Sequence, residues 1–309
     1  MTLNWCVELP PASRTQRLLS GLLRGVTRVL FRGLMRPAVP LLMQRALLRL
    51  ATLLPPRARG VVIRPGRLGE VRCEWLQGAR DNGWVVLYLH GGAFVLGSPR
   101  THRAITSHLA SLSGARVCAV DYRLAPEHPW PAAVDDALSA YRALLTQGRP
   151  ADQLVIAGDS AGGQLTLSLA LRLREAGLPL PAALVCFSPV SDLSGATWHE
   201  PPAGDPLLGR AWLEQGVRSY CAGQPDLRAA WLSPRYASLH DLPPLLVQVG
   251  SDEHLLTQSL ALQEHAELAL RLEVYPGQWH VFQINCGLLQ VARLAMQRVA
   301  AFLKEQGCQ

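Results

Sequence analysis

From about residue 69 onward, short apolar runs alternate with longer amphipathic runs, and this alternation restricts the fold more than any other feature of the 309-residue chain. Because the strand-like runs from Val85 onward are continuously apolar, helices are expected on both faces of the sheet. The pattern predicts an α/β fold with a mostly parallel, doubly wound sheet. Strands are expected near 69–76, 84–90, 115–121, 153–158, 182–188, 244–250 and 271–275, and helices near 101–113, 132–147, 161–176, 255–268 and 285–305.

Two segments depart from this alternation. Residues 15–53 carry leucines and valines near the helical period and are predicted to be helical, with a break at Pro37 and Pro40. Residues 190–240 are rich in Pro, Trp and Gly and contain no clear strand, so they are interpreted as an excursion above the sheet.

Ser160 is the best candidate for a nucleophile. The sequence Gly158-Asp159-Ser160-Ala161-Gly162 joins a predicted strand, Val155–Ala157, to a predicted helix. In that context the G-x-S-x-G pattern indicates a sharp turn that exposes the serine hydroxyl at the carboxyl end of the sheet. Small residues on either side of the serine let the strand and helix approach closely.

A serine hydroxyl needs a base, and the base needs an orienting acid, which follow the serine along the chain in this kind of fold. Asp252 follows the strand at 244–250, and His280 follows the last strand. We therefore predict that Asp252 and His280 complete a triad with Ser160. Glu253 is the alternative acid and His254 the alternative base; Asp252 could also cap a helix.

Backbone N–H groups should stabilise the oxyanion of the tetrahedral intermediate. Ala161 follows the nucleophile, and Gly91-Gly92 directly follow the strand Val85–Leu89, where two glycines allow close approach of the backbone. Gly91, Gly92 and Ala161 are thus the predicted donors. His90 is expected to brace the loop.

These motifs together resemble the hormone-sensitive-lipase-like family of α/β hydrolases over about residues 60–305. The resemblance implies the α/β-hydrolase fold and hydrolysis of short to medium acyl esters through Ser160, Asp252 and His280, without a metal or organic cofactor. It also implies a helical cap, formed by residues 1–60 and by 190–240 inserted into a catalytic domain of residues 61–309. The matching motifs are Tyr88–Phe94, Asp121–Glu127, Gly158–Gly163, Ser188-Pro189 with Asp192, and Val249–Glu253.

The resemblance also bears on residues around the predicted site. The family's oxyanion motif often has a third glycine where this chain has Ala93, a less favoured third donor because its Cβ narrows the backbone choices. It makes Asp159 a support for neighbouring loops and Glu127 an anchor of the loop 122–131. Trp198, Trp212, Tyr220 and Trp231 of the cap either line an apolar pocket or pack the cap itself. An amidase, lactonase or deacetylase would use the same triad. A non-catalytic ligand-binding protein of this fold, such as the gibberellin receptors, lacks the histidine that His280 supplies here.

Charge and cysteine content limit the remaining possibilities. The net charge of +7 belongs to the N-terminus, since residues 1–60 hold ten arginines and a single acidic residue, Glu8. The rest of the chain has no basic stripe with interleaved aromatic residues, so nucleic-acid binding is not predicted. An odd number of cysteines, seven, and no recognisable signal peptide or membrane-spanning run favour a cytoplasmic location. The arginine-rich segment is either a cap helix with a solvated basic face or a peripheral anchor on anionic membranes.

Overall fold

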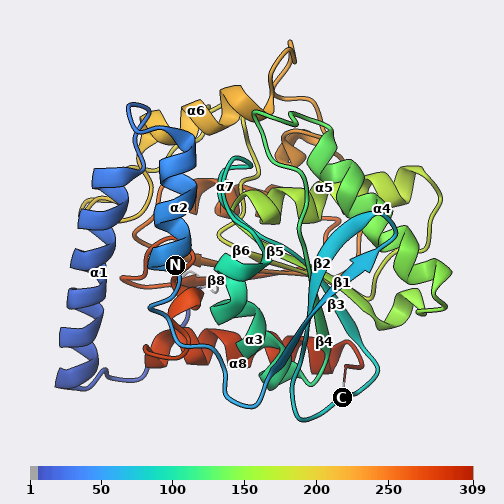
Figure 1. Ribbon diagram of the computed structural model, residues 1–309, viewed down its shortest axis with the longest axis horizontal. Helices are drawn as coiled ribbons and strands as arrows, with labels where there is room; N and C mark the ends of the chain where they lie inside the picture. The colour runs from blue at the N-terminus through green and yellow to red at the C-terminus, as the bar shows by residue number, and fades with distance from the viewer. Residues whose placement is uncertain (1–5, 309) are drawn as a thin grey trace.

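The computed structural model describes residues 6–308, and an eight-stranded sheet forms its centre (Figure 1). The sheet order is β1-β2-β4-β3-β5-β6-β7-β8, with β1 and β2 antiparallel and all pairs from β4 to β8 parallel. The predicted mostly parallel, doubly wound α/β fold is confirmed. The strands are β1 (Val62–Leu68), β2 (Val71–Gln77), β3 (Val85–Leu89), β4 (Arg116–Val120), β5 (Leu154–Asp159), β6 (Ala183–Phe187), β7 (Leu245–Gly250) and β8 (Leu270–Tyr275).

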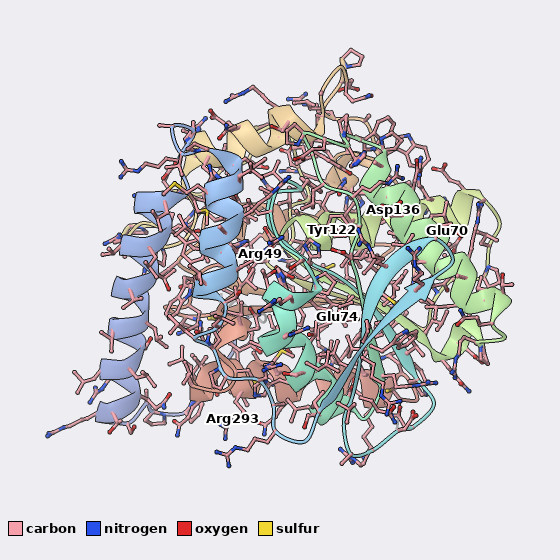
Figure 2. The ribbon with its side chains drawn as sticks, in the orientation of Figure 1. Arg49, Glu70, Glu74, Tyr122, Asp136 and Arg293 are labelled. Atoms are coloured by element: carbon pink, nitrogen blue, oxygen red, sulfur yellow. The ribbon has the colours of Figure 1, made fainter. Side chains whose placement is uncertain are left out.

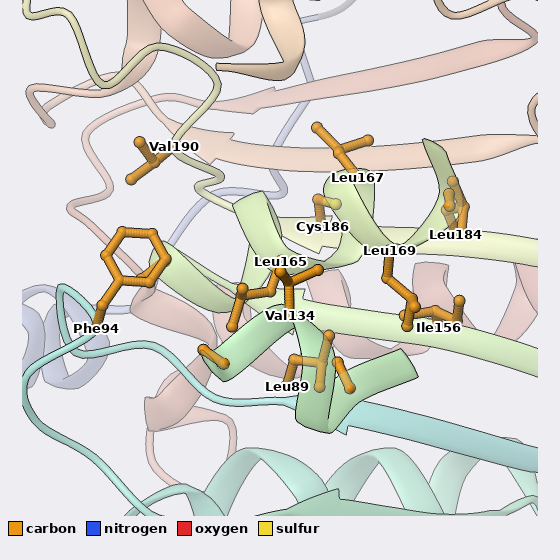
Figure 3. Packing of buried hydrophobic residues seen from close by; sticks show 14 of the residues in the cluster. Leu89, Phe94, Val134, Ile156, Leu165, Leu167, Leu169, Leu184, Cys186 and Val190 are labelled. Atoms are coloured by element: carbon orange, nitrogen blue, oxygen red, sulfur yellow. The ribbon is translucent and has the colours of Figure 1, made fainter. Parts of the chain in front are cut away.

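Helices cover both faces of the sheet, which is why its central strands are apolar throughout. The strand residues alternate between two cores: Val85, Leu87 and Leu89 of β3 face one, and Val86 and Tyr88 face the other. The helices α3 (Arg103–Ser113) and α8 (Gln290–Glu305) pack together on one face, while α4 (Ala132–Thr146) and α5 (Ala161–Glu175) pack on the other. Figure 3 shows the core between the sheet and the helices α4 and α5, with Leu89 and Ile156 from the sheet beside Val134, Leu165 and Leu169 from the helices.

One strand was not expected from the sequence. Residues 62–68 form β1, which contains Pro65 and Gly66 and therefore lacks the continuous apolar character of the other strands. Proline cannot donate a hydrogen bond to a neighbouring strand and is tolerated at the edge of a sheet. β1 occupies that edge and pairs only with β2 among the strands of the described chain.

The remaining helices lie beyond the carboxyl ends of the parallel strands. The N-terminal helices α1 (Arg14–Leu34) and α2 (Leu41–Ala51) stand side by side at one end of the molecule, and α6 (Arg210–Tyr220) crosses near them (Figure 1). Trp212 of α6 donates its indole N–H to Oε1 of Gln44 on α2 at 2.7 Å, and Gln44 is buried. The short helix α7 (Leu256–Ala261) follows β7. Of the predicted segment 1–60, residues 1–5 lie outside the described part of the chain, as does Gln309 of the predicted catalytic domain.

Some arginines of α1 turn toward the rest of the protein. Arg24 forms an ion pair with Asp252 at 2.8 Å, Arg32 donates to the carbonyl oxygen of Asp205 at 2.8 Å, and Arg28 donates to that of Ala203 at 2.5 Å. The basic face of α1 is therefore only partly exposed to solvent. Among residues 6–308, no helix combines the length and the apolar character that crossing a bilayer requires.

The tightest packing in the fold occurs where β5 turns into α5. A Cβ at Gly162 would collide with the carbonyl oxygen of Leu89, and one at Gly158 would collide with that of Gly162. These contacts explain why glycine stands on both sides of Ser160: the first turn of α5 rests against the carboxyl end of β3.

Gly162→Ala is expected to destabilise the protein by about 3 kcal/mol or more, because backbone atoms of two elements must separate to admit the methyl group. Gly25→Ala is the matched control: a Cβ at Gly25 of α1 meets no atom within 4 Å, and alanine favours a helix by up to about 1 kcal/mol over glycine. Urea unfolding of both variants measures the difference. Equal stabilities would contradict this account of the turn.

Candidate active site

Ser160 occupies the turn between β5 and α5 with an unusual backbone conformation. Its φ is 54° and its ψ is −117°, a strained combination for a residue with a Cβ. Two backbone hydrogen bonds hold it there: Ser160 N–H donates to Phe187 at 2.8 Å, and Val190 N–H donates to the Ser160 carbonyl at 3.1 Å. The N-terminus of α5 lies directly behind the serine, where its dipole favours negative charge.

Ser160 and His280 line one apolar cavity of about 160 Å³. An engineered cavity of similar volume in another protein holds a benzene molecule, so this space suits a small organic group. The walls come mainly from the N-terminal helices, with one aromatic residue from α6. The principal wall residues are Leu23, Val26, Leu30, Phe31, Met35, Leu48, Ala51, Leu54 and Trp212.

His280 is buried and contacts a buried carboxylate. Its Nδ1 lies 3.2 Å from Oε1 of Glu253, a residue with no solvent exposure. The other carboxylate oxygen of Glu253 accepts hydrogen bonds from Ser188 Oγ at 2.7 Å and from Gly250 N–H at 2.9 Å. Burial alone would lower the pKa of His280, but the hydrogen bond and charge of Glu253 raise it above its ordinary value of 6.5.

The prediction that Asp252 orients His280 does not agree with this geometry. The Asp252 carboxylate points instead to the surface of α1, where it pairs with Arg24 at 2.8 Å and accepts a hydrogen bond from Ser251 Oγ at 2.8 Å. The alternative acid, Glu253, has the position that was expected for Asp252. His254, the alternative base, is not among the residues that line the cavity with Ser160, and its Nδ1 contacts the carbonyl oxygen of His199 at 2.7 Å.

The predicted oxyanion donors differ in whether their N–H groups already donate a hydrogen bond. The N–H of Gly91 donates to Oδ1 of Asp159 at 3.0 Å, so it is already engaged, and this corrects the expectation for Gly91. In the described part of the chain, no acceptor is recorded for the N–H groups of Gly92, Ala93 or Ala161. Gly91, Gly92 and Ala93 all line the cavity, and Ala93 adopts the left-handed conformation with φ 50° despite its Cβ.

Asp159 joins the nucleophile turn to the loop after β3. Besides Gly91, its carboxylate accepts from Tyr88 OH at 2.7 Å and lies 3.3 Å from Nε2 of His102. Burial works against charge on both groups, yet their attraction lowers the pKa of Asp159 and raises that of His102. Sequence reasoning did not single out His102, because no motif marks it and it is brought to Asp159 only by folding.

His90 and Glu127 brace loops, as was expected of them. His90 stacks on Tyr122, with ring centroids 4.2 Å apart, and burial lowers the pKa of His90 to about 3, so the ring is neutral. Tyr122, labelled near the centre of Figure 2, donates its hydroxyl to the carbonyl of His90 at 2.5 Å. Glu127 accepts two hydrogen bonds from Arg45 of α2, at 2.7 and 2.8 Å, and these lower the pKa of Glu127 to about 2.

Of the four aromatic residues singled out in 190–240, Trp212 lines the cavity. Tyr220 stacks on Phe94 with centroids 3.7 Å apart, and Trp198 packs edge-on against His254, so both pack against loops that follow strands of the sheet. Trp231 accepts hydrogen bonds from α5 through its backbone carbonyl. The main walls are instead supplied by α1 and α2.

Comparisons with known proteins agree with the geometry. Residues 86–284 match the family model described as the alpha/beta hydrolase fold. The chain is similar to an acetyl-hydrolase of Streptomyces hygroscopicus, with 43% identity over 77% of this chain and 81% of the relative. It is also similar to an esterase of Acinetobacter venetianus, with 38% identity over 80% of this chain and 83% of the relative.

Solved structures extend the similarity over nearly the whole chain. One is an esterase from the bacterial hormone-sensitive lipase family, which superimposes with a TM-score of 0.86 at 36% identity and covers 96% of this chain and 99% of its own. The likeness therefore includes the N-terminal helices as well as the sheet.

Proposed function

The chain belongs to the hormone-sensitive-lipase-like family of α/β hydrolases and is a serine ester hydrolase, and we propose that Ser160, His280 and Glu253 carry out its reaction. The observation that carries this assignment is the pairing of His280 Nδ1 with the buried carboxylate of Glu253 at 3.2 Å, while His280 and Ser160 line the same cavity.

In the proposed mechanism, Nε2 of His280 takes the proton of Ser160 as its oxygen attacks the ester carbonyl carbon. Glu253 fixes the imidazole tautomer and stabilises the imidazolium that forms. His280 then gives the proton to the departing alcohol, leaving an acyl-enzyme on Ser160. A water molecule, deprotonated by His280, then attacks the acyl carbon. The bond to Ser160 breaks, the acid leaves, and His280 returns the proton to the Ser160 oxygen.

The oxyanion of each tetrahedral intermediate is proposed to accept hydrogen bonds from the N–H groups of Gly92, Ala93 and Ala161. Two observations support this choice: these groups have no recorded acceptor among residues 6–308, whereas Gly91 donates to Asp159. Asp159 is then a positioning residue. It holds the loop after β3 through Gly91, so that the N–H groups of Gly92 and Ala93 face the reacting carbonyl.

The two N-terminal helices and residues 190–240 are proposed to form a cap over the reacting groups. Arg45 supports this arrangement because it ties α2 to Glu127 and also donates to the carbonyl of Val95 at 2.9 Å, in the loop after β3. The apolar walls and small volume of the cavity favour a short acyl group, in line with the name of the acetyl-hydrolase relative.

Ser160→Ala is expected to lower the kcat for an aryl acetate by at least about 10⁴-fold, because the acyl-enzyme cannot form. The assay uses protein freed of host esterases, and thermal unfolding confirms that the variant is folded. Turnover near the wild-type rate by the folded variant would contradict the assignment.

Glu253→Gln is expected to lower kcat by about 10³- to 10⁴-fold. Two donors, Ser188 Oγ and Gly250 N–H, hold one oxygen of Glu253, so the glutamine oxygen will take that place and its NH₂ will face His280. That arrangement selects the wrong imidazole tautomer for a base. Asp252→Asn is the matched control and should retain activity within about tenfold. Steady-state kinetics measure kcat for both variants. A larger loss of kcat in Asp252→Asn than in Glu253→Gln would contradict the proposal.

The pH profile gives a second readout of the same contact. Only neutral His280 can accept the serine proton, so kcat/KM should fall as the pH decreases through the His280 pKa, which lies above 6.5 in the folded protein. Any residual activity of Glu253→Gln should persist to lower pH, since burial without the carboxylate lowers this pKa. An unchanged acidic limb would argue against Glu253.

Aryl esters of increasing acyl length are expected to show the highest kcat/KM at short chains. Phe31→Ala, which enlarges the cavity, should move the optimum to longer chains, whereas Leu22→Ala on the outer side of α1 should not. Rising rates through long acyl chains in the wild-type protein would contradict the proposed acyl preference. Parallel anilides and lactones in the same assay separate ester hydrolysis from amidase and lactonase activity.

A further inference from the structure

The outer surface of α1 and α2 is unusually apolar. Eleven large apolar side chains are exposed among residues 6–308, and nine of them lie between residues 18 and 54. We call these nine residues the apolar face. They are Leu18, Leu22, Val26, Val29, Leu42, Met43, Leu50, Leu53 and Leu54, with exposed fractions up to 78% at Leu42.

Helical spacing explains why this surface is left uncovered. Leu18, Leu22 and Val29 are separated by four and seven residues and so share the outward side of α1, with exposed fractions of 76%, 64% and 75%. Leu23 and Leu30 face the cavity instead. The helix is thus apolar on two sides, and an apolar side that finds no core indicates a surface that binds something else.

The charge around the apolar face is of one sign. Residues 9–60 contain ten arginines and no acidic residue. Four of these arginines contact the rest of the protein, namely Arg24, Arg28 and Arg32 of α1 and Arg45 of α2. Arg14, Arg17 and Arg49 are exposed. Arg49, labelled in Figure 2, belongs to α2. This charge favours an anionic surface and opposes contact with the same face of a second copy.

The apolar face is continuous with the cavity of Ser160. Val26 and Leu54 belong to both, and a groove between α1 and α2 shares part of the cavity wall. An ester with a short acyl group could place that group beside Ser160 while an apolar alcohol part extends along the groove. The groove is lined by Leu30, Phe31, Leu34, Met35, Leu47, Leu50, Ala51 and Leu54.

We propose that the apolar face docks on an anionic lipid surface and that apolar esters of short acids enter the cavity from that surface. The docking step rests on the exposed face and its arginines. The second step also rests on the proposed function, since it assumes that Ser160 reacts with the ester.

Sedimentation of the full chain with vesicles tests the docking step. Vesicles of phosphatidylcholine and phosphatidylglycerol in equal parts should pellet the protein at low salt, with less pelleting at moderate salt and much less on phosphatidylcholine alone. Arg14→Gln with Arg17→Gln should weaken partitioning about fivefold per arginine, from roughly 1 kcal/mol for each basic residue near an anionic surface. Equal pelleting with and without vesicles overturns the proposal.

A matched pair of variants tests the apolar contribution. Leu22→Glu with Val29→Glu should reduce vesicle binding at least tenfold, whereas Val62→Glu, an exposed valine of β1 outside the apolar face, should reduce it much less. Neither Leu22 nor Val29 lines the cavity, so all variants should hydrolyse a dissolved aryl acetate at the wild-type rate. The proposal is overturned if the two variants lose vesicle binding equally. It is also overturned if the wild type binds no vesicles and instead forms a concentration-dependent dimer that the double variant abolishes.

The same assays separate the two steps. Vesicle binding by a protein that hydrolyses no ester would refute the proposed function and leave docking intact. Hydrolysis of dissolved esters without vesicle binding would refute docking alone. For substrate entry, an apolar acetate ester embedded in anionic vesicles should be hydrolysed at least tenfold more slowly by the double glutamate variant than by the wild type. Equal rates would overturn entry from the surface.

Discussion

The contact between the first turn of α5 and the carboxyl end of β3 is the constraint on which the site depends. Gly162 lies against the carbonyl of Leu89 so closely that no side chain fits. This approach brings the serine turn next to the loop after β3, so Asp159 can reach Gly91 and Gly92 can line the same cavity as Ser160. β3 and β5 are also the strands at which the sheet order reverses, where α/β sheets form their binding crevices.

The sequence was sufficient to predict the order of strands and helices, because a sheet covered on both faces needs apolar runs. It did not predict β1, whose Pro65 and Gly66 are compatible with an edge strand but resemble a loop. The nucleophile turn was predictable because its glycines stand where neighbouring backbone leaves no room for a side chain. The loop position of His280 was predictable for a related reason: it follows the last strand of the sheet.

The choice between two adjacent carboxylates was not predictable in this way. Asp252 and Glu253 follow the same strand, and only the path of the turn decides which of them points inward. Ser188 and Gly250 donate to Glu253, which is fully buried, while Arg24 of α1 holds Asp252 at the surface. Gly91 is a similar case, because its donor role depends on Asp159, which lies 68 residues later in the chain. Contacts of this kind, between residues far apart in the chain, cannot be predicted from a local motif.

The pairing of His280 with Glu253 is the central claim, and labelling of Ser160 by a fluorophosphonate tests it most directly. The rate of labelling, followed by mass spectrometry of the peptide that contains Ser160, reports activation of this hydroxyl without any assumption about the substrate. The account predicts rapid labelling of Ser160 in the wild type and in Asp252→Asn, and labelling slowed by orders of magnitude in folded Glu253→Gln. Labelling of Glu253→Gln at the wild-type rate, or at a residue other than Ser160, would contradict it.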